Sequence, residues 1–225
     1  MGNFDIGELI LYMVAILFSL SVHETGHAWV SNHFGDDLAK SQGRISLNPL
    51  VHIDPLGTLL FPILAFTFHL PIIGWAKPVP VNPLRWKEQR KANFWVAIAG
   101  ILGNLLIALG ATLAFRLMLG VMGREGIAAN DTLEVLYRFI HLLFLMNIGL
   151  AVFNLVPIPP LDGSKIIASF LPGGFYGNLH TIEALGSQYG IILLYGAMYL
   201  GVFRAIFGFI YPFANGLFYL GTGLQ

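Results

Sequence analysis

The feature that most constrains this chain is an apolar stretch near its N-terminus, from Ile6 to about Phe34, that contains no proline. Charged residues, Glu8 and Asp36, mark its two ends. In a helix with a rise of about 1.5 Å per residue these two residues are about 42 Å apart, which exceeds the roughly 30 Å thickness of a bilayer core. The stretch therefore predicts a transmembrane helix. Residues 1–8 contain no Lys or Arg, which a cleaved signal peptide would carry, so we expect the helix to be retained.

The rest of the chain also has the composition of a membrane protein. Of its 225 residues, 56% are hydrophobic and 11% are charged, whereas an ordinary soluble domain carries roughly a quarter charged residues. Further apolar stretches occupy about residues 92–119, 133–156 and 189–213, the last as one span or as two short pieces divided near Gly201. We therefore expect an all-α polytopic membrane protein in the lipid bilayer, a single domain over residues 1–225 with about four to six transmembrane helices.

Charge and cysteine content exclude several classes of function. The 12 basic residues balance the 12 acidic residues, so the chain lacks the positive field that recruits nucleic acid, and we expect no nucleic-acid partner. The sequence contains no cysteine, which excludes disulfides, a thiol nucleophile and zinc sites built from thiolates. Any metal ion must therefore be held by His, Asp or Glu.

The first helix carries three ionisable residues, His23, Glu24 and His27, in the pattern H-E-x-x-H. Four helical steps rotate by about 400°, so both imidazoles lie on one face roughly one turn apart and can bind one metal ion. Glu24 lies about 100° from His23, so its carboxylate is free to act as a general base. An ionisable group inside the membrane costs about 2.5 kcal/mol or more, so three of them indicate a function. The pattern predicts the site of a zinc metalloprotease.

A catalytic zinc site needs a third protein ligand. Asp162 is the best candidate, because it follows the fourth apolar stretch directly, in the proline-rich sequence PIPPLDG. The alternative is an interfacial turn carboxylate in an Asp-Gly pair, which the sequence leaves open. Four residues in or beside polar loops are weaker candidates, because contact with water explains each of them. They are His33, Asp36, His52 and Asp54.

Two segments after the first helix are broken by turn residues. Residues 36–55 contain Gly43, Pro49 and Pro55, which favour short strands or a β-hairpin. Residues 56–75 are apolar but contain two prolines, and the loops on both sides are basic. If both loops are cytoplasmic, residues 56–75 form a re-entrant element next to the active site; the alternative is a span. The basic residues of the two loops are Lys40, Arg44, Lys77, Arg85, Lys87, Arg90 and Lys91.

Three pieces of the chain, HETGH, AGILGN and FNLVPIPPLDG, together resemble the site-2 proteases, which are intramembrane zinc metalloproteases. The resemblance covers nearly the whole chain and is to the compact subgroup without PDZ or CBS domains. It implies one Zn²⁺ per chain, ligated by His23, His27 and Asp162. It also implies a role for Asn154 near the scissile carbonyl or the substrate strand, with a helix-to-helix hydrogen bond as the alternative. Asn104 matches a motif of the family's third helix, where packing is the favoured role.

The resulting expectation is a zinc metalloendopeptidase that cleaves transmembrane-protein substrates in or near the bilayer, with Glu24 as general base. We expect a multi-pass protein of the cell membrane with its active site nearer the cytoplasmic face, and a homo-oligomer is possible. An edge strand from residues 39–50, or the re-entrant element, would hold an unwound substrate by strand addition. The competing class is a membrane metal transporter or metal sensor with the same His and Asp cluster, in which Glu24→Gln would leave function intact.

Overall fold

The structure, a computed structural model, describes residues 6–68, 74–172 and 174–222, and every regular element in these ranges is helical. The long helices of the first two-thirds of the chain are α1 (Ile6–His33), α4 (Gln89–Ala128) and α5 (Asp131–Leu155). The C-terminal helices are α6 (Asp162–Phe170), α7 (Phe175–Tyr199) and α8 (Val202–Phe218). Between α1 and α4 lie α2 (Leu38–Ser41), η1 (Pro49–Val51), η2 (Pro55–Leu60), α3 (Phe61–Thr67) and η3 (Pro83–Arg85). The prediction of an all-α fold is confirmed.

Three of the described helices, α1, α4 and α5, are long and apolar enough to cross a membrane. A fourth span is obtained if the bent pair of Gln188–Tyr199 and Val202–Phe218 counts as one. The two helices meet at an angle of 64°, and Gly201 between them has a positive φ of 76°, which glycine adopts without a steric penalty. The polytopic membrane class is therefore confirmed, at the lower end of the expected number of spans, and the division near Gly201 is the one that the sequence suggested.

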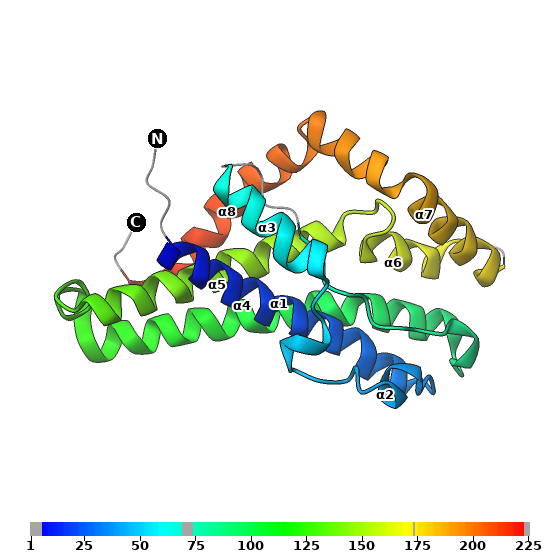
Figure 1. Ribbon diagram of the computed structural model, residues 1–225, viewed down its shortest axis with the longest axis horizontal. Coiled ribbons are helices and arrows are strands. Elements are labelled where there is room, and N and C mark those ends of the chain that lie inside the picture. Colours follow the sequence, from blue (N-terminus) through cyan, green and yellow to red (C-terminus); the bar gives the residue numbers. More distant parts are fainter. Residues whose placement is uncertain (1–5, 69–73, 173, 223–225) are drawn as a thin grey trace.

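α4 and α5 form a long helical hairpin, and α1 lies along it (Figure 1). The hairpin turns between Gly123, where α4 is kinked at a positive φ of 66°, and Asn130. The side-chain oxygen of Asn130 accepts hydrogen bonds from the backbone N–H groups of Thr132 and Leu133 and so caps α5. Farther along the hairpin, the ring of Phe115 on α4 stacks on that of Phe218 on α8 at a centroid distance of 4.6 Å. This contact joins α8 to the hairpin.

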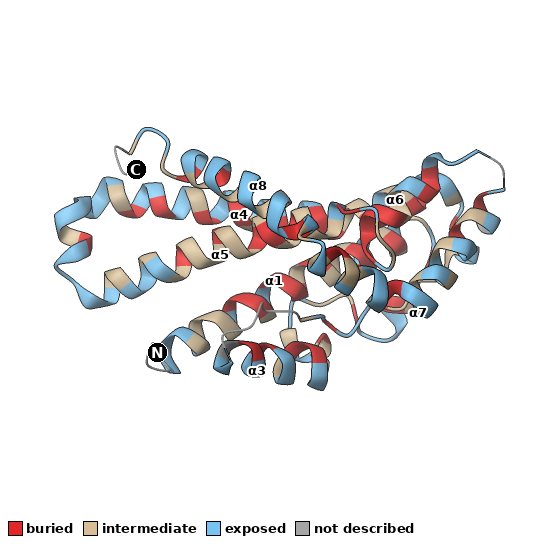
Figure 2. Cartoon of the chain, turned by 90° about the horizontal axis from the view of Figure 1, so that it is seen from above, coloured by how far each residue is buried: buried red, intermediate tan, exposed pale blue. Residues whose placement is uncertain are grey.

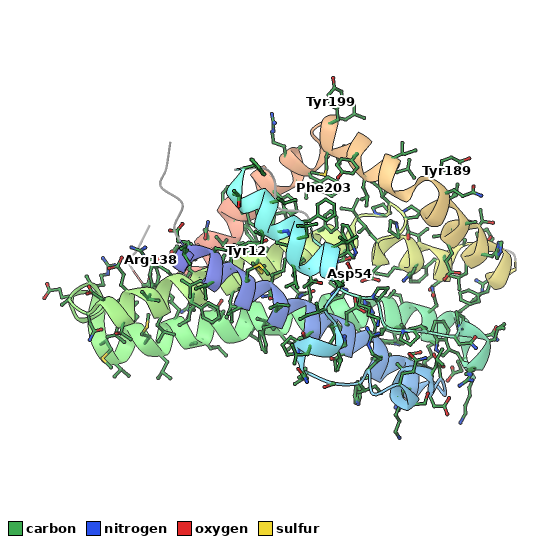
Figure 3. The ribbon with its side chains drawn as sticks, in the orientation of Figure 1. Tyr12, Asp54, Arg138, Tyr189, Tyr199 and Phe203 are labelled. Atoms are coloured by element: carbon green, nitrogen blue, oxygen red, sulfur yellow. The ribbon has the colours of Figure 1, made fainter. Side chains whose placement is uncertain are left out.

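Buried residues gather where α1, α4 and α6 meet, while the outward faces of the long helices are exposed (Figure 2). The exposed residues are largely apolar: Leu106 and Leu117 on α4 are 68% and 70% exposed. Tyr189 and Tyr199 of α7 also point away from the rest of the chain (Figure 3). A soluble protein rarely exposes so large an apolar surface, whereas lipid tails solvate it without penalty.

The prediction of short strands or a β-hairpin over residues 36–55 is wrong. The segment instead forms α2, η1 and turns, and no strand occurs in the part of the chain that the structure describes. Two Asx-Pro pairs explain the difference, because Asn and Asp cap helices and Pro is favoured at the first helical position. The side chain of Asn48 caps the turn that begins at Pro49, and Asp54 accepts hydrogen bonds from the N–H groups of Leu56 and Gly57.

Residues 56–75 contain no helix of spanning length among their described positions. The apolar helix over Pro55–Ala65 is about 16 Å long, roughly half a bilayer core. After this helix the chain comes back to the residues around the start of the helix. The N–H of Trp75 donates to the carbonyl of Gly57, and the N–H of Lys77 donates to the carbonyl of His52. This return is the geometry that a re-entrant element requires. Pro71 and His69 lie outside the described residues.

Candidate metal centre

His23 and His27 lie on the face of α1 that packs against α4, and both are buried. Their rings meet edge to face with centroids 4.5 Å apart, and their Nε2 atoms are 2.9 Å apart. This is the arrangement that the four-residue spacing predicts for a helix. Two imidazole nitrogens therefore face one point between α1 and its neighbours.

Asp162 reaches the same point from the first turn of α6. Its Oδ2 atom lies 3.3 Å from Nε2 of His23 and 3.2 Å from Nε2 of His27. The start of α6 can lie this close to the end of α5 only because Gly163 has no side chain: a Cβ there would be 2.2 Å from the carbonyl oxygen of Leu155. The structure thus brings together the three residues that the sequence proposed as ligands, and their ligand atoms all lie within 4.8 Å of one another.

The second nitrogen of each histidine is held by a hydrogen-bond acceptor. Nδ1 of His27 lies 2.6 Å from the backbone carbonyl oxygen of Val96, which can only accept, so this nitrogen carries the proton. Nδ1 of His23 lies 2.7 Å from Oδ1 of Asn104. With the proton on Nδ1, a neutral imidazole presents the lone pair of its Nε2 atom, and the Nε2 atoms of both histidines face Asp162. A metal-binding histidine is oriented by its other nitrogen in this way.

A chain of amide hydrogen bonds fixes which end of Asn104 faces His23. Nδ2 of Asn147 on α5 donates to the backbone carbonyl of Leu143, so its Oδ1 atom faces Asn104. Nδ2 of Asn104 donates to that oxygen at 2.8 Å, which leaves the Oδ1 atom of Asn104 to accept from His23. Both asparagines are fully buried. The sequence analysis missed Asn147, although a polar side chain inside an apolar helix was a signal for it.

The donor set fits a metal ion. Oδ2 of Asp162 is buried and has no hydrogen-bond partner among the described residues. Three lone pairs therefore converge with no hydrogen between them, an arrangement that is repulsive unless a cation lies at its centre. Two imidazoles, one carboxylate and no thiolate match the three-ligand set of a catalytic zinc site, and the site fits one Zn²⁺.

Gly100 on α4 gives the two histidines their space. A Cβ at this position would lie 2.6 Å from Cε1 of His23 and 2.6 Å from Nε2 of His27. Such distances are too short for any side chain, so the backbone of α4 itself forms the wall behind the two rings. Gly100, the first glycine of the sequence AGILGN, thus gives the site its space.

Glu24 is half-buried next to the ligands and is not one of the three converging groups. Its Oε2 atom accepts a hydrogen bond of 2.8 Å from the backbone N–H of Val79. Asn154 lies near the end of α5, where its Nδ2 atom donates to the carbonyl of Leu150 one turn earlier. No hydrogen bond from Asn154 to the three ligands occurs in the described structure. Its predicted contact with substrate stays a prediction.

The weaker ligand candidates have structural partners away from the three converging residues. Asp36 accepts hydrogen bonds from Ser31 and from the N–H groups of Leu38 and Asn82. His52 lies with Nε2 2.8 Å from the carbonyl oxygen of Ser46. Asp54 caps η2, and His33 stacks on Trp29. Lys165, which the sequence analysis did not consider, lies with Nζ 4.0 Å from Oδ1 of Asp162.

Comparison with known proteins agrees with a metalloprotease site. The profile of Peptidase family M50 matches residues 11–197, so the chain belongs to this family, the site-2 protease family that its sequence resembles. The chain is a zinc metalloprotease of the integral-membrane type.

Individual relatives carry corresponding names. The chain is 39% identical over 174 residues to "Putative zinc metalloprotease YwhC" of Bacillus subtilis, covering 77% of this chain and 75% of the relative. It is 32% identical over 194 residues to "Putative zinc metalloprotease Rip2" of Mycolicibacterium smegmatis, covering 84% and 66%. It is 29% identical over 165 residues to "Putative zinc metalloprotease MJ0611" of Methanocaldococcus jannaschii, covering 73% of each. No solved structure matches the chain significantly.

Proposed function

We propose that this protein is an intramembrane endopeptidase that hydrolyses peptide bonds within or near the transmembrane segments of membrane-protein substrates. The observation that carries the proposal is the buried convergence of His23, His27 and Asp162 inside a set of apolar helices, with Glu24 beside them. An ionisable cluster in such surroundings is rare unless it has a function. In a metalloprotease that function is peptide hydrolysis.

In this proposal His23, His27 and Asp162 hold the zinc ion. Bound Zn²⁺ supplies Lewis acidity, which polarises the scissile carbonyl and lowers the pKa of water to about 7. Glu24 accepts the proton of the attacking water while the water oxygen bonds to the carbonyl carbon. When the carbon–nitrogen bond breaks, Glu24 passes the proton to the leaving amine, so no other proton source is needed.

Asn154 is the proposed contact for the substrate. Its carboxamide can make more hydrogen bonds than the one it makes to Leu150, because an asparagine side chain offers two N–H groups and an accepting oxygen. The carbonyl groups of a substrate helix accept hydrogen bonds within the helix. The helix must therefore unwind locally before one of its carbonyl groups can enter the site beside Glu24 and accept a hydrogen bond from Asn154. Substrates with Gly, Pro or Asn near the cleavage site fit this requirement best.

The position of the site favours cleavage near the cytoplasmic face of the cell membrane. His27 lies six residues before the end of α1, about 9 Å along the helix axis. The segments that follow this end carry most of the basic residues of the chain, which the positive-inside rule assigns to the cytoplasm. The ligands therefore lie in the half of the bilayer next to that face.

The experiment that tests the proposal compares the wild type with Glu24→Gln in proteoliposomes. The substrate is a single-span reporter whose transmembrane helix contains a Gly-Pro pair. We expect about one zinc ion per chain in both proteins, and a loss of cleavage of about 100-fold or more in Glu24→Gln because the general base is gone. A matched control is Glu134→Gln, which removes an exposed carboxylate paired with Arg138 and should leave cleavage unchanged. Unimpaired cleavage by Glu24→Gln would favour the metal transporter or sensor.

A further inference from the structure

Arg44 is a buried cation that pairs with no carboxylate in the part of the chain that the structure describes. The residue is 7% exposed, and its Nε atom has no hydrogen-bond partner among the described residues. None of the ion pairs between described residues includes Arg44. Burying an unpaired guanidinium is costly. The free-energy cost of this burial must therefore be offset by hydrogen bonds to the backbone groups that the guanidinium contacts.

Those contacts are two carbonyl groups of the extended segment formed by residues 74–82. Nη2 of Arg44 donates to the carbonyl of Lys77 at 2.7 Å and to that of Pro78 at 3.3 Å. The carbonyl of Pro78 belongs to the same peptide unit as the N–H of Val79, which donates to Oε2 of Glu24. A single peptide unit thus connects the guanidinium of Arg44 to the carboxylate of Glu24.

The electrostatics of this connection are favourable in both directions. A cation at the carbonyl end of a peptide unit increases the polarity of its N–H, and a carboxylate at the N–H end increases the polarity of its carbonyl. The Val79 N–H is also isolated from competing donors, because Pro78 and Pro80 on either side have none. The proline rings restrict the backbone of this short stretch to extended conformations.

The connection is tied to α1 and to the segment that follows α1. The side chain of Thr25, the residue after Glu24, donates to the carbonyl of Ser46, two residues after Arg44. The N–H of Lys77 donates to the carbonyl of His52, and the N–H of Asn82 donates to Asp36. Arg44, residues 74–82 and Glu24 are therefore held in one rigid arrangement beside the metal ligands.

We propose that Arg44 is a positioning residue for Glu24, acting through the Pro78–Val79 peptide unit. The Val79 N–H occupies Oε2 of Glu24 and fixes the carboxylate in one orientation, which leaves Oε1 to accept the proton of the attacking water. This inference rests on the proposed function of Glu24 as general base. Arg44 touches neither the substrate nor the metal ligands in this role.

The first test is Arg44→Met in the full-length protein, with zinc content, kcat and KM measured on the same single-span reporter. Methionine fills a similar space without donating hydrogen bonds. We expect zinc to stay at about one per chain, kcat to fall by about 100-fold because the base is misplaced, and KM to change little. The matched control is Arg85→Met, which removes an exposed arginine paired with Asp37 and should not change kcat. An unchanged kcat in Arg44→Met would overturn the proposal.

The second test separates positioning from general support of the fold. Val79→Pro removes the N–H that Glu24 accepts, and Val79→Ala removes the same side chain but keeps the N–H. We expect Val79→Pro to lower kcat by about 100-fold and Val79→Ala, which keeps the N–H, to lower it far less. In the Val79→Pro background, Arg44→Met should have little further effect, because both changes act through the same peptide. Independent effects that multiply would contradict the proposal. If Arg44→Met does not fold, the difference between Val79→Pro and Val79→Ala still tests whether the Val79 N–H positions Glu24, and equal kcat in these two variants would contradict the proposal.

A third measurement does not depend on catalysis. Since Pro78 and Pro80 carry no amide hydrogen, hydrogen–deuterium exchange of a peptide over residues 78–80 reports on Val79 alone. Exchange should be faster in Arg44→Met and in Glu24→Ala than in the wild type, and unchanged in Arg85→Met. If the wild type fails to cleave but this pattern holds, the positioning survives and the protease proposal fails. If Arg44→Met does not alter exchange, the positioning itself is wrong.

Discussion

The Nδ1 atom of His23 lies 2.7 Å from the Oδ1 atom of Asn104, so a side chain of α4 determines how a candidate metal ligand of α1 is oriented. Asn104 is in turn fixed by Asn147 of α5. The three long helices thus meet in one buried row of polar groups that ends at the candidate zinc site. The hydrogen bonds that pack the helices together also orient a ligand.

Replacing Asn104 should weaken zinc binding. In Asn104→Ala the imidazole of His23 loses the acceptor that keeps its proton on Nδ1, and loss of such an outer partner typically costs about 10- to 100-fold in metal affinity. Competition with a zinc chelator of known affinity measures the change. Asn215→Ala is a matched control, because it removes an asparagine that lies 3.0 Å from His141, away from the candidate zinc site. Equal zinc affinity in Asn104→Ala and Asn215→Ala would show that Asn104 serves packing alone.

A methyl group at position 100 should expel the metal. In Gly100→Ala the new Cβ would lie 2.6 Å from atoms of both histidine rings, so the rings must move away from the position that faces Asp162. We expect zinc content well below one per chain by elemental analysis. Gly110→Ala makes the same change on the same helix at a position where the new Cβ would meet nothing within 4 Å apart from the neighbouring backbone of its own helix. It should keep its zinc and gain up to about 1 kcal/mol of helix stability. Full zinc occupancy in Gly100→Ala would contradict the position of α4 behind the site.

Asp162 should be required for metal binding. Asp162→Ala removes the third ligand and leaves two histidines, so we expect purified protein to retain little zinc after dialysis against a weak chelator. Asp131→Ala changes an exposed aspartate at the start of α5 and is the control. The two variants should differ in zinc content while their helical circular dichroism stays alike. Stoichiometric zinc in Asp162→Ala would mean that a residue other than Asp162 supplies the third ligand.

The long helices could be predicted closely from hydropathy alone. The stretches over residues 92–119 and 133–156 correspond to α4 (Gln89–Ala128) and α5 (Asp131–Leu155). α4 extends past the predicted limits at its N-terminal end because helical hydrogen bonding continues into polar residues, which a hydropathy window excludes. At its C-terminal end the helix is interrupted at Gly123, whose φ is 66°, and a short helical piece follows to Ala128. The apolar signal marks the part of a helix inside the bilayer and not the whole helix.

The connection between α1 and α4 was harder to predict. Turn residues in the 36–55 segment indicated a hairpin, but Asn48 and Asp54 act as helix caps before Pro49 and Pro55. Asn-Pro and Asp-Pro pairs occur both in turns and at the starts of helices, so the sequence by itself did not distinguish the two. The role of residues 74–82 beside Glu24 had no local signal, since it depends on contacts with residues 33 to 55 positions away.

The sequence by itself determined that the chain lies in a membrane, which helices are long enough to cross it, and that His23 and His27 share one face of α1. These properties follow from hydropathy and from the helical repeat, which act over a few residues. Only the tertiary structure decided that Asp162 faces those histidines, that Asn104 and Val96 set their tautomers, and that Val79 holds Glu24. Each of these contacts joins segments that are far apart in the chain, and only the packing of α1, α4, α5 and α6 brings them within hydrogen-bonding distance.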